Sequence, residues 1–402
     1  MATEKVSGPL SGVRVLDLTN VLAGPFACHQ LAHLGAEVIK VEAVSRGDLA
    51  RNLGADPDLS AAGMGISFLA QNAGKASLTL NLKDPRGKEV LKSLVQGSDV
   101  LVENYRPGVM DRLGLGYETL RQTNPNLIYC AISGFGQTGP WADRPAYDQI
   151  IQGVSGVMSI TGDSQSAPLR VGYPLADTVG GLTAAMAICA ALNADEKGAF
   201  IDVSMLESVL ATMGWVVSNH LVGGVAPSAQ GNENPTSAPS GAFQCADGLI
   251  NIAANKDEQW TLLAHHLGRA DLLGQTEYAT REDRKAHRLR LKAELETVLT
   301  TRPARDWAEE LNAIGVPAGA VMSVPDALEH PQIMGRDFIK RFETVPGVDR
   351  PVDIVSVGAL FNGKRPTVKT PPPELGQDST HILESMGYSA ETIETLRKEG
   401  VI

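Results

Sequence analysis

The sequence predicts an α/β protein with a Rossmann-like, doubly wound parallel sheet in a large domain and a smaller α+β domain after it. Three observations lead to this prediction. Short apolar strands alternate with helices from residue 13 to residue 222, the pattern of parallel sheets. Residues 223–240, rich in Gly, Pro, Ser and Asn, break that rhythm. A hairpin signal and charged helices then follow.

The elements of the first part follow from short apolar runs separated by longer periodic segments. Pro25 suits the first turn of a helix. Amide hydrogens in that turn have no partner within the helix, so the missing hydrogen of proline costs no hydrogen bond there. Strands are expected at 13–18, 37–41, 77–82, 99–103, 127–133 and 200–203. Helices are expected at 25–34, 84–94, 117–122, 147–158, 178–193 and 204–222.

The second part begins with two β runs, 242–245 and 249–253, around Ala246-Asp247-Gly248. Helices are expected at 257–267, 282–300 and 304–313, and the last eighty residues carry strands, three consecutive prolines and two short helices. We therefore predict a large domain over 1–222, a linker over 223–240, a small α+β domain over 241–322, and a C-terminal segment over 323–402 that returns to the large domain.

Composition excludes several classes of protein. With 43% hydrophobic and 20% charged residues the chain of 402 residues is ordinary for a globular protein, and a net charge of -11 disfavours nucleic-acid binding. The N-terminus has no apolar signal core, and the most apolar window, 182–192, is too short to span a bilayer. We therefore expect a cytoplasmic protein with no membrane partner. The four cysteines are scattered, which argues against structural zinc.

Two familiar motifs have weak support in their context. Gly134–Gly139 matches G-x-G-x-x-G, but Pro140 and Pro145 oppose the helix that a dinucleotide site requires. His29 and His33 lie four residues apart, yet the residue after His29 is Gln where a zinc protease needs Glu. We expect surface or half-buried histidines and no metal.

Residues 102–114 are chemically unusual because they follow the carboxyl end of a predicted strand, where open α/β sheets bind ligands. They offer an amide, an aromatic ring and guanidinium groups, a set that suits a nucleotide with phosphates and a stackable base. A structural loop with an Arg–Glu pair explains the same residues equally well.

Residues 174–181 are the second unusual stretch. Asp177, ahead of an apolar helix, is first of all a candidate N-cap of that helix. The same position suits a covalent nucleophile, because the helix dipole would keep the carboxylate ionised. Gly180 and Gly181 would let a substrate approach the backbone closely. The residues alone leave both roles open.

Taken together, ordered motifs along essentially the whole chain resemble the class III CoA-transferases, the group of formyl-CoA transferase, carnitine CoA-transferase and the acyl-CoA racemases. The motifs are Leu16-Asp17-Leu18-Thr19, Ala23-Gly24-Pro25, the strand 35–42, Gly47-Asp48, the 103–114 stretch, Ser133-Gly134-Phe135-Gly136, Asp202-Val203-Ser204, and Pro371-Pro372-Pro373 with Leu375-Gly376. The resemblance implies an interlocked homodimer in which each chain threads the other.

The resemblance also implies site residues. Asp177 holds the position of the family's aspartate nucleophile, and the implied CoA contacts are Ala23, Leu80, Asn104, Tyr105 and Arg112. Ala43 stands where formyl-CoA transferase has an adenine-stacking arginine, so Arg46 or Arg51 is expected to compensate.

Other positions depart from the family's best-known members. Leu22 stands where formyl-CoA transferase has a glutamine that covers the active site, and 231–235 occupies a region comparable to the tetraglycine loop of formyl-CoA transferase. Tyr147-Asp148 matches the His-Asp pair of the racemase branch, and tyrosine is a poor base at neutral pH. Asp148 is then expected to position Tyr147 or the acceptor.

The expected activity is transfer of CoA from an acyl-CoA, with succinyl-CoA as the favoured donor, to a small carboxylic acid, preferably a dicarboxylate. It would proceed through an aspartyl-acyl mixed anhydride and an aspartyl-CoA thioester, with no permanently bound cofactor. The turn 134–139 and the loop near Gly231 are candidate oxyanion donors. The alternatives are a racemase or epimerase acting at the α-carbon of an acyl-CoA, and a non-catalytic CoA-binding protein.

Overall fold

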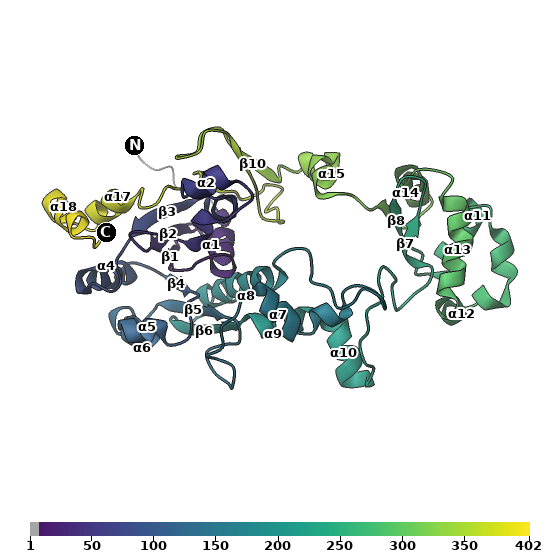
Figure 1. Cartoon of the computed structure of the whole chain (residues 1–402), viewed down its shortest axis with the longest axis horizontal. Helices are drawn as coiled ribbons and strands as arrows, with labels where there is room; N and C mark the ends of the chain where they lie inside the picture. Colours follow the sequence, from purple (N-terminus) through teal and green to yellow (C-terminus); the bar gives the residue numbers. More distant parts are fainter. Residues whose placement is uncertain (1–7) are drawn as a thin grey trace. The chain divides into compact units, whose positions relative to one another are not determined.

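The computed structural model describes residues 8–402, and these form two compact units (Figure 1). One unit takes in the described residues up to 157 together with 170–224 and 334–402. The other consists of 158–169 and 225–333. The smaller unit includes 158–169, which the sequence prediction assigned to the large domain. The domain boundaries stay a prediction, because a compact unit is not yet an independently folding domain.

A six-stranded parallel sheet forms the centre of the larger unit, so the predicted α/β class with a parallel sheet is confirmed. Its strands are β1 (Arg14–Asp17), β2 (Glu37–Glu42), β3 (Lys75–Thr79), β4 (Val100–Glu103), β5 (Ile128–Ser133) and β6 (Ala199–Ser204). The spatial order β3-β2-β1-β4-β5-β6 reverses direction between β1 and β4. Ligands of open α/β sheets bind outside the carboxyl ends of the strands at such a reversal.

Helices cover both faces of this sheet because its strands are apolar on both sides. On one face the buried core joins strand residues to α4 (Pro85–Gln96), α6 (Tyr117–Thr123), α17 (Ser379–Ser385) and α18 (Ala390–Lys398). On the other, α1 (Ala23–His33) and α8 (Leu175–Leu192) pack against each other and onto the strands. Short helices α2 (Pro57–Ala61), α3 (Ile66–Asn72) and α5 (Val109–Leu113) complete this part.

The helices after β5 differ from the prediction at their ends. The expected helix 147–158 stops early, as α7 (Asp148–Val154). The expected helix 204–222 is two helices, α9 (Met205–Thr212) and α10 (Gly214–Gly223), because Gly214 adopts a positive φ of 39° that interrupts the regular backbone. Helix α10 has no buried residue.

The smaller unit has an antiparallel sheet in the order β7-β8-β9, of β7 (Ser240–Gln244), β8 (Leu249–Ala253) and β9 (Ala318–Ala320). The predicted hairpin is therefore present. Its core joins the sheet to α11 (Asp257–His266), α13 (Arg288–Leu299) and α14 (Ala304–Ala313), and α12 (Arg281–Ala286) precedes α13. The helix α15 (Val324–Glu329) follows β9, and α16 (Pro331–Met334) follows α15.

The C-terminal residues of the larger unit, after the hairpin of β10 (Ile339–Phe342) and β11 (Val352–Val355), lie against the edge strand β3. The Ser77 hydroxyl accepts the amide hydrogen of Gly376 at 2.9 Å, and the Asp378 carboxylate accepts that of Ser77 at 2.8 Å. Buried Arg51 donates to the Pro373 carbonyl at 3.3 Å. The proline-rich stretch is thus fixed to the large sheet.

Helix α8 is the one helix among residues 8–402 that is long and apolar enough, by length and composition, to cross a membrane. The sequence prediction counted only 182–192 and missed this, because the helix runs on from Leu175. Core helices of soluble proteins pass the same test, and α8 packs on α1, α9 and β5.

Candidate active site

Asp177 lies in the first turn of α8 and does not cap that helix. Pro174 is the N-cap residue, and the free amide hydrogens of the first turn are instead accepted by Asp148 from α7. Its Oδ1 lies 2.8 Å from the nitrogen of Ala176 and 3.4 Å from that of Asp177. The capping role weighed for Asp177 is therefore wrong, because a carboxylate from another helix already fills it.

The carboxylate of Asp177 is half-buried, and the structure gives it no hydrogen-bond partner among residues 8–402. Burial raises its pKa to about 7, and the nearby charge of Asp148 adds to the rise. The expectation that the helix dipole keeps it ionised needs correction, because burial and a like charge outweigh the dipole here. An unpartnered carboxylate of raised basicity is the stronger nucleophile once ionised.

The glycines after Asp177 serve helix packing, which corrects the expectation that they leave room for substrate. A Cβ on Gly181 would lie 2.5 Å from the carbonyl oxygen of Ala23 and 3.0 Å from the Phe26 ring, and one on Gly180 would lie 2.9 Å from Met205. Both positions are thus filled by neighbouring helices. The contact places Ala23, a predicted CoA-binding residue, one helical turn along α8 from Asp177.

The loop before Ala23 is strained and held by polar contacts. Val21 has φ of 67°, a conformation that costs a β-branched residue of the order of 1–3 kcal/mol. The Asp48 carboxylate accepts its amide hydrogen at 2.8 Å. The Asn104 side chain accepts from the Asn20 nitrogen and donates to the Asn20 carbonyl, both at 2.8 Å. These bonds join the loop after β1 to the end of β4, at the reversal of the sheet.

A buried ion network lies beneath this loop. Lys75 donates to Asp17 at 2.8 Å, and Lys40 lies 2.9 Å from Asp48 and donates to the Thr19 carbonyl. Burial opposes ionisation of Asp17, but the two lysines outweigh it and hold the Asp17 pKa below its ordinary value. Since a buried charge is costly without its partner, the network fixes the position of the loop.

The predicted CoA contacts gather at the carboxyl ends of the strands. Ala23 follows β1, Arg46 follows β2, Leu80 follows β3, and Asn104 and Tyr105 follow β4. Ala23 and Leu80 are buried, whereas Arg46 and Arg112 are exposed and available to a ligand. Binding of CoA by these residues stays a prediction.

Arg51, the alternative to Arg46 as the adenine-stacking group, is wrong. Its guanidinium is buried, bonds both oxygens of Glu42 at 2.8 Å, and stacks 3.7 Å from the centre of the Phe68 ring. All its faces are therefore occupied by the protein. The Arg–Glu pair weighed for 102–114 is also not formed at Glu103, whose carboxylate accepts the Tyr105 amide hydrogen at 2.7 Å; burial raises the Glu103 pKa to about 8.

Tyr147 is 70% exposed and is the N-cap residue of α7. The two histidines, expected to be at the surface or half-buried, are both buried, and His33 Nε2 lies 3.0 Å from His29 Nε2. Burial lowers the pKa of His29 and brings that of His33 to about 4, so both are neutral.

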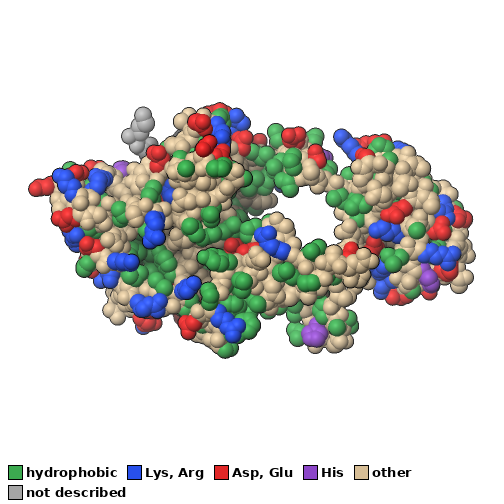
Figure 2. Space-filling view, in the orientation of Figure 1, with side chains coloured by type: hydrophobic (Ala, Val, Ile, Leu, Met, Phe, Trp, Pro, Cys, Tyr) green, Lys and Arg blue, Asp and Glu red, His purple; other side chains and the backbone are tan. Residues whose placement is uncertain are grey.

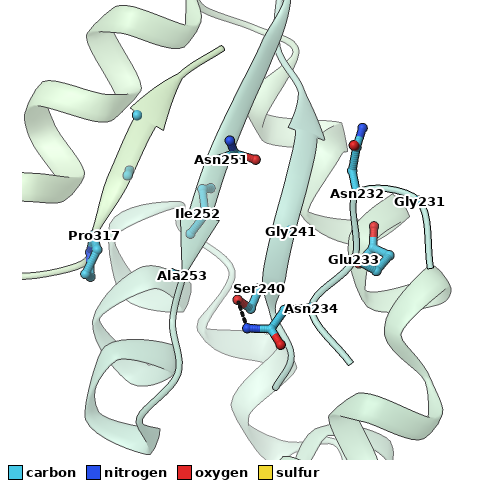
Figure 3. A pocket seen from close by; sticks show the side chains of 12 residues that line it. Gly231, Asn232, Glu233, Asn234, Ser240, Gly241, Asn251, Ile252, Ala253 and Pro317 are labelled. Atoms are coloured by element: carbon cyan, nitrogen blue, oxygen red, sulfur yellow. Dashed lines mark hydrogen bonds between the residues drawn. The ribbon is translucent and has the colours of Figure 1, made fainter. Parts of the chain in front are cut away.

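Two candidate oxyanion donors already have partners. The Gln137 amide hydrogen is accepted by Asp202, with both carboxylate oxygens within 3.0 Å, and that of Gly231 by the Gly162 carbonyl at 2.7 Å. The loop at Gly231 belongs to the smaller unit. It borders a hollow of about 550 Å³ there, and the Asn234 side chain donates to Ser240 at 3.2 Å (Figure 3).

Sequence reasoning missed two residues that contact Asp148. Fully buried Gln152 donates to Asp148 Oδ2 at 2.7 Å, and Arg170 Nε lies 3.9 Å from the same oxygen. The spacing of Asp148 and Gln152, four residues apart on one helix face, was a usable signal for the first. No local pattern marks Arg170.

Comparison with known proteins gives consistent results. The family model described as CoA-transferase family III matches residues 10–379. The chain is 40% identical to an acetyl-CoA:oxalate CoA-transferase of Acetobacter aceti, over 87% of this chain and 90% of that protein. It is 36% identical to a succinyl-CoA:glutarate CoA-transferase of Mus musculus, over 98% and 90%. A CaiB/BaiF family protein of Brucella suis superposes with a TM-score of 0.82 at 33% identity, over 94% of this chain and 99% of that one.

Proposed function

Because the chain belongs to CoA-transferase family III and is a CoA-transferase that acts on CoA thioesters, we propose that it moves CoA from succinyl-CoA to a dicarboxylate with Asp177 as the covalent nucleophile. One observation carries the proposal. Asp177 stands in the first turn of α8 with an unpartnered carboxylate, while Asp148 performs the capping that would otherwise occupy it.

In the first half of the reaction, an oxygen of the Asp177 carboxylate attacks the thioester carbonyl carbon. The C–S bond breaks and CoA thiolate leaves, giving an aspartyl-acyl anhydride; a thiol pKa of about 8.5 makes this a good leaving group. The thiolate then attacks the aspartyl carbonyl carbon. The donor acid departs as a carboxylate and the aspartyl-CoA thioester remains.

In the second half, the acceptor carboxylate attacks the aspartyl thioester and releases the thiolate, forming a second anhydride. The thiolate attacks the acceptor acyl carbon, which yields the new acyl-CoA and returns Asp177 to its carboxylate. Overall, the thioester of the donor is replaced by a thioester of the acceptor, so the transfer needs no other source of energy. Burial of Asp177 supports the proposal, because anhydrides need protection from water.

The dicarboxylate and the succinyl donor are proposed from the relatives' activities. A succinate–glutarate CoA-transferase of Agrobacterium fabrum is 36% identical over 96% of both chains. The related proteins named here are CoA-transferases, so racemisation and non-catalytic CoA binding are not favoured. Tyr147, at the position of the racemase histidine, carries a phenol, which is a poor base at neutral pH.

We also propose a homodimer, the interlocked arrangement expected from the sequence. Large apolar side chains are exposed to solvent on two helices. They are Leu182 and Met186 on α8, and Trp215, Leu221 and Val222 on α10. Trp215 is 79% exposed. Figure 2 shows hydrophobic side chains open to the surface where Figure 1 labels α10. Large exposed apolar patches of this kind mark protein interfaces.

The test of the proposed function is a substrate screen with a matched variant. Purified protein is incubated with succinyl-CoA and each of a panel of mono- and dicarboxylic acids, and new acyl-CoA species are identified by mass spectrometry. We expect the wild type to form a dicarboxyl-CoA and Asp177→Ala to form none while keeping its circular dichroism spectrum. Near-native turnover by Asp177→Ala would overturn the mechanism, and transfer only to monocarboxylates would overturn the acceptor class.

A further inference from the structure

The segment between Arg170 and α8 is fixed to α7 by one buried amide. Gln152 Oε1 accepts the amide hydrogen of Val171 at 2.9 Å, and its Nε2 donates to the Tyr173 carbonyl at 3.2 Å. The same Nε2 donates to Asp148 at 2.7 Å. Because Gln152 is fully buried, these bonds hold the segment in one conformation.

The Asp148 carboxylate links Arg170 to the nucleophile. Its Oδ1 accepts the amide hydrogens that open α8, including that of Asp177, and its Oδ2 lies 3.9 Å from Arg170 Nε. The backbone nitrogen of Asp177 and the guanidinium of Arg170 therefore contact different oxygens of one carboxyl group. The fold thus connects the guanidinium of Arg170 to the first turn of α8, which carries Asp177, through the Asp148 carboxylate.

The charge of Arg170 is only partly engaged. Its side chain is 44% exposed, and its sole ion pair within residues 8–402 is the long contact with Asp148. The structure gives its two terminal nitrogens, Nη1 and Nη2, no hydrogen-bond partner in the described chain. Those two nitrogens form the planar fork that binds a carboxylate through two parallel hydrogen bonds.

The site needs such a cation. Asp148 and Asp177 already place two acidic groups together, so a dicarboxylate that presents one carboxylate to the nucleophile would otherwise leave its second charge unpaired beside them. We propose that Arg170 binds the distal carboxylate of the dicarboxylate acceptor and thereby selects dicarboxylates over monocarboxylates. This inference rests on the proposed function and names the residue that sets its acceptor class.

The test compares two acids with the same five-carbon chain, glutarate and valerate, which differ in the second carboxylate. Steady-state transfer from saturating succinyl-CoA is measured for the wild type, Arg170→Gln, Arg170→Lys and the control Arg121→Gln. Arg121 is an exposed arginine on α6 whose ion pair is with Glu118. Since a hydrogen bond to a charged group contributes about 1.5–3 kcal/mol, Arg170→Gln should lower kcat/KM for glutarate by about tenfold to a hundredfold.

A selectivity role predicts a change that a structural role does not. Valerate transfer should change by less than about threefold, Arg170→Lys should recover part of the glutarate activity, and Arg121→Gln should match the wild type. An equal loss for both acids would make Arg170 a structural residue and overturn the inference. Unchanged preference for glutarate would overturn it as well.

A binding measurement separates this inference from the proposed mechanism. Glutarate is titrated calorimetrically into Asp177→Asn, which cannot turn over, with and without Arg170→Gln. We expect Arg170→Gln to raise the Kd about tenfold or more. An unchanged Kd overturns the role of Arg170 alone. Failure of the wild type to transfer CoA to either acid overturns the proposed function, whatever the binding result.

Discussion

Replacing Asp148 with Asn should make Asp177 a stronger acid without removing the cap of α8. The amide Oδ1 of Asn can accept the same hydrogens from Ala176 and Asp177. The negative charge is lost, together with the hydrogen bond that Oδ2 accepts from Gln152, because an amide NH2 group cannot accept it. Burial, the first cause of the raised Asp177 pKa, remains, whereas the repulsion from Asp148 disappears. The Asp177 pKa should therefore fall from about 7 towards its ordinary value.

The magnitude follows from that pKa. With a pKa of about 7, roughly half of the Asp177 side chains are ionised at pH 7 and about a tenth at pH 6. If the carboxylate is the nucleophile, kcat/KM for the acyl-CoA donor should fall about fivefold from pH 7 to pH 6, fall close to tenfold per pH unit below that, and level off above about pH 8. In Asp148→Asn the inflection should move to lower pH.

The assay is the pH dependence of donor kcat/KM, which reports ionisations of the free enzyme. Asp195→Asn, which removes an exposed acid in the loop after α8, is the matched control and should leave the inflection where it is. A profile in Asp148→Asn that stays in place or moves to higher pH would refute the electrostatic account of the site. A flat wild-type profile across this range would refute the assignment of the ionising nucleophile.

Three further outcomes are expected. Gly181→Ala should lower the free energy of unfolding by about 1–3 kcal/mol in chemical denaturation and weaken acyl-CoA binding, because the new Cβ would lie 2.5 Å from a carbonyl oxygen of α1. The control Gly358→Ala places its Cβ in open space and should change little. The free energy of unfolding should fall as the pH drops from about 6.5 towards 4, because His29 and His33 take up protons at higher pH in the unfolded chain than in the folded chain. His33→Leu should make this dependence on pH less steep. Trp215→Lys should convert a dimer into a monomer in light scattering, and a wild type that is already monomeric would contradict the proposed interface.

Local patterns were sufficient to predict most of the large sheet. The apolar runs that became β1, β2 and β5 are flanked by turn residues, and their periodicity does not depend on distant contacts. The start of α8 was misplaced because its cap comes from Asp148, 28 residues earlier, which no local signal reveals. The predicted helix 204–222 is interrupted by the positive φ of Gly214, a backbone conformation that the neighbouring residues in the sequence do not indicate.

In the candidate site, too, some residues could be identified from the sequence and others only from the structure. The resemblance identified Asp177, but the partners that decide its chemistry, Asp148 and Gln152, act through contacts between α7 and α8. Arg51 looked available in the sequence and is buried in the structure, because Glu42 and Phe68 meet it only after folding. Burial and pairing of single charged residues are tertiary properties, which a one-dimensional pattern does not contain.

Mass spectrometry of the peptide that carries Asp177 tests the central claim most directly. The protein is mixed with succinyl-CoA without acceptor, trapped with hydroxylamine or borohydride, and digested. The account predicts a donor-dependent modification confined to Asp177, absent from Asp177→Asn and abolished when excess succinate and free CoA reverse the half-reaction. An unmodified Asp177 peptide from protein that is actively exchanging CoA would contradict it.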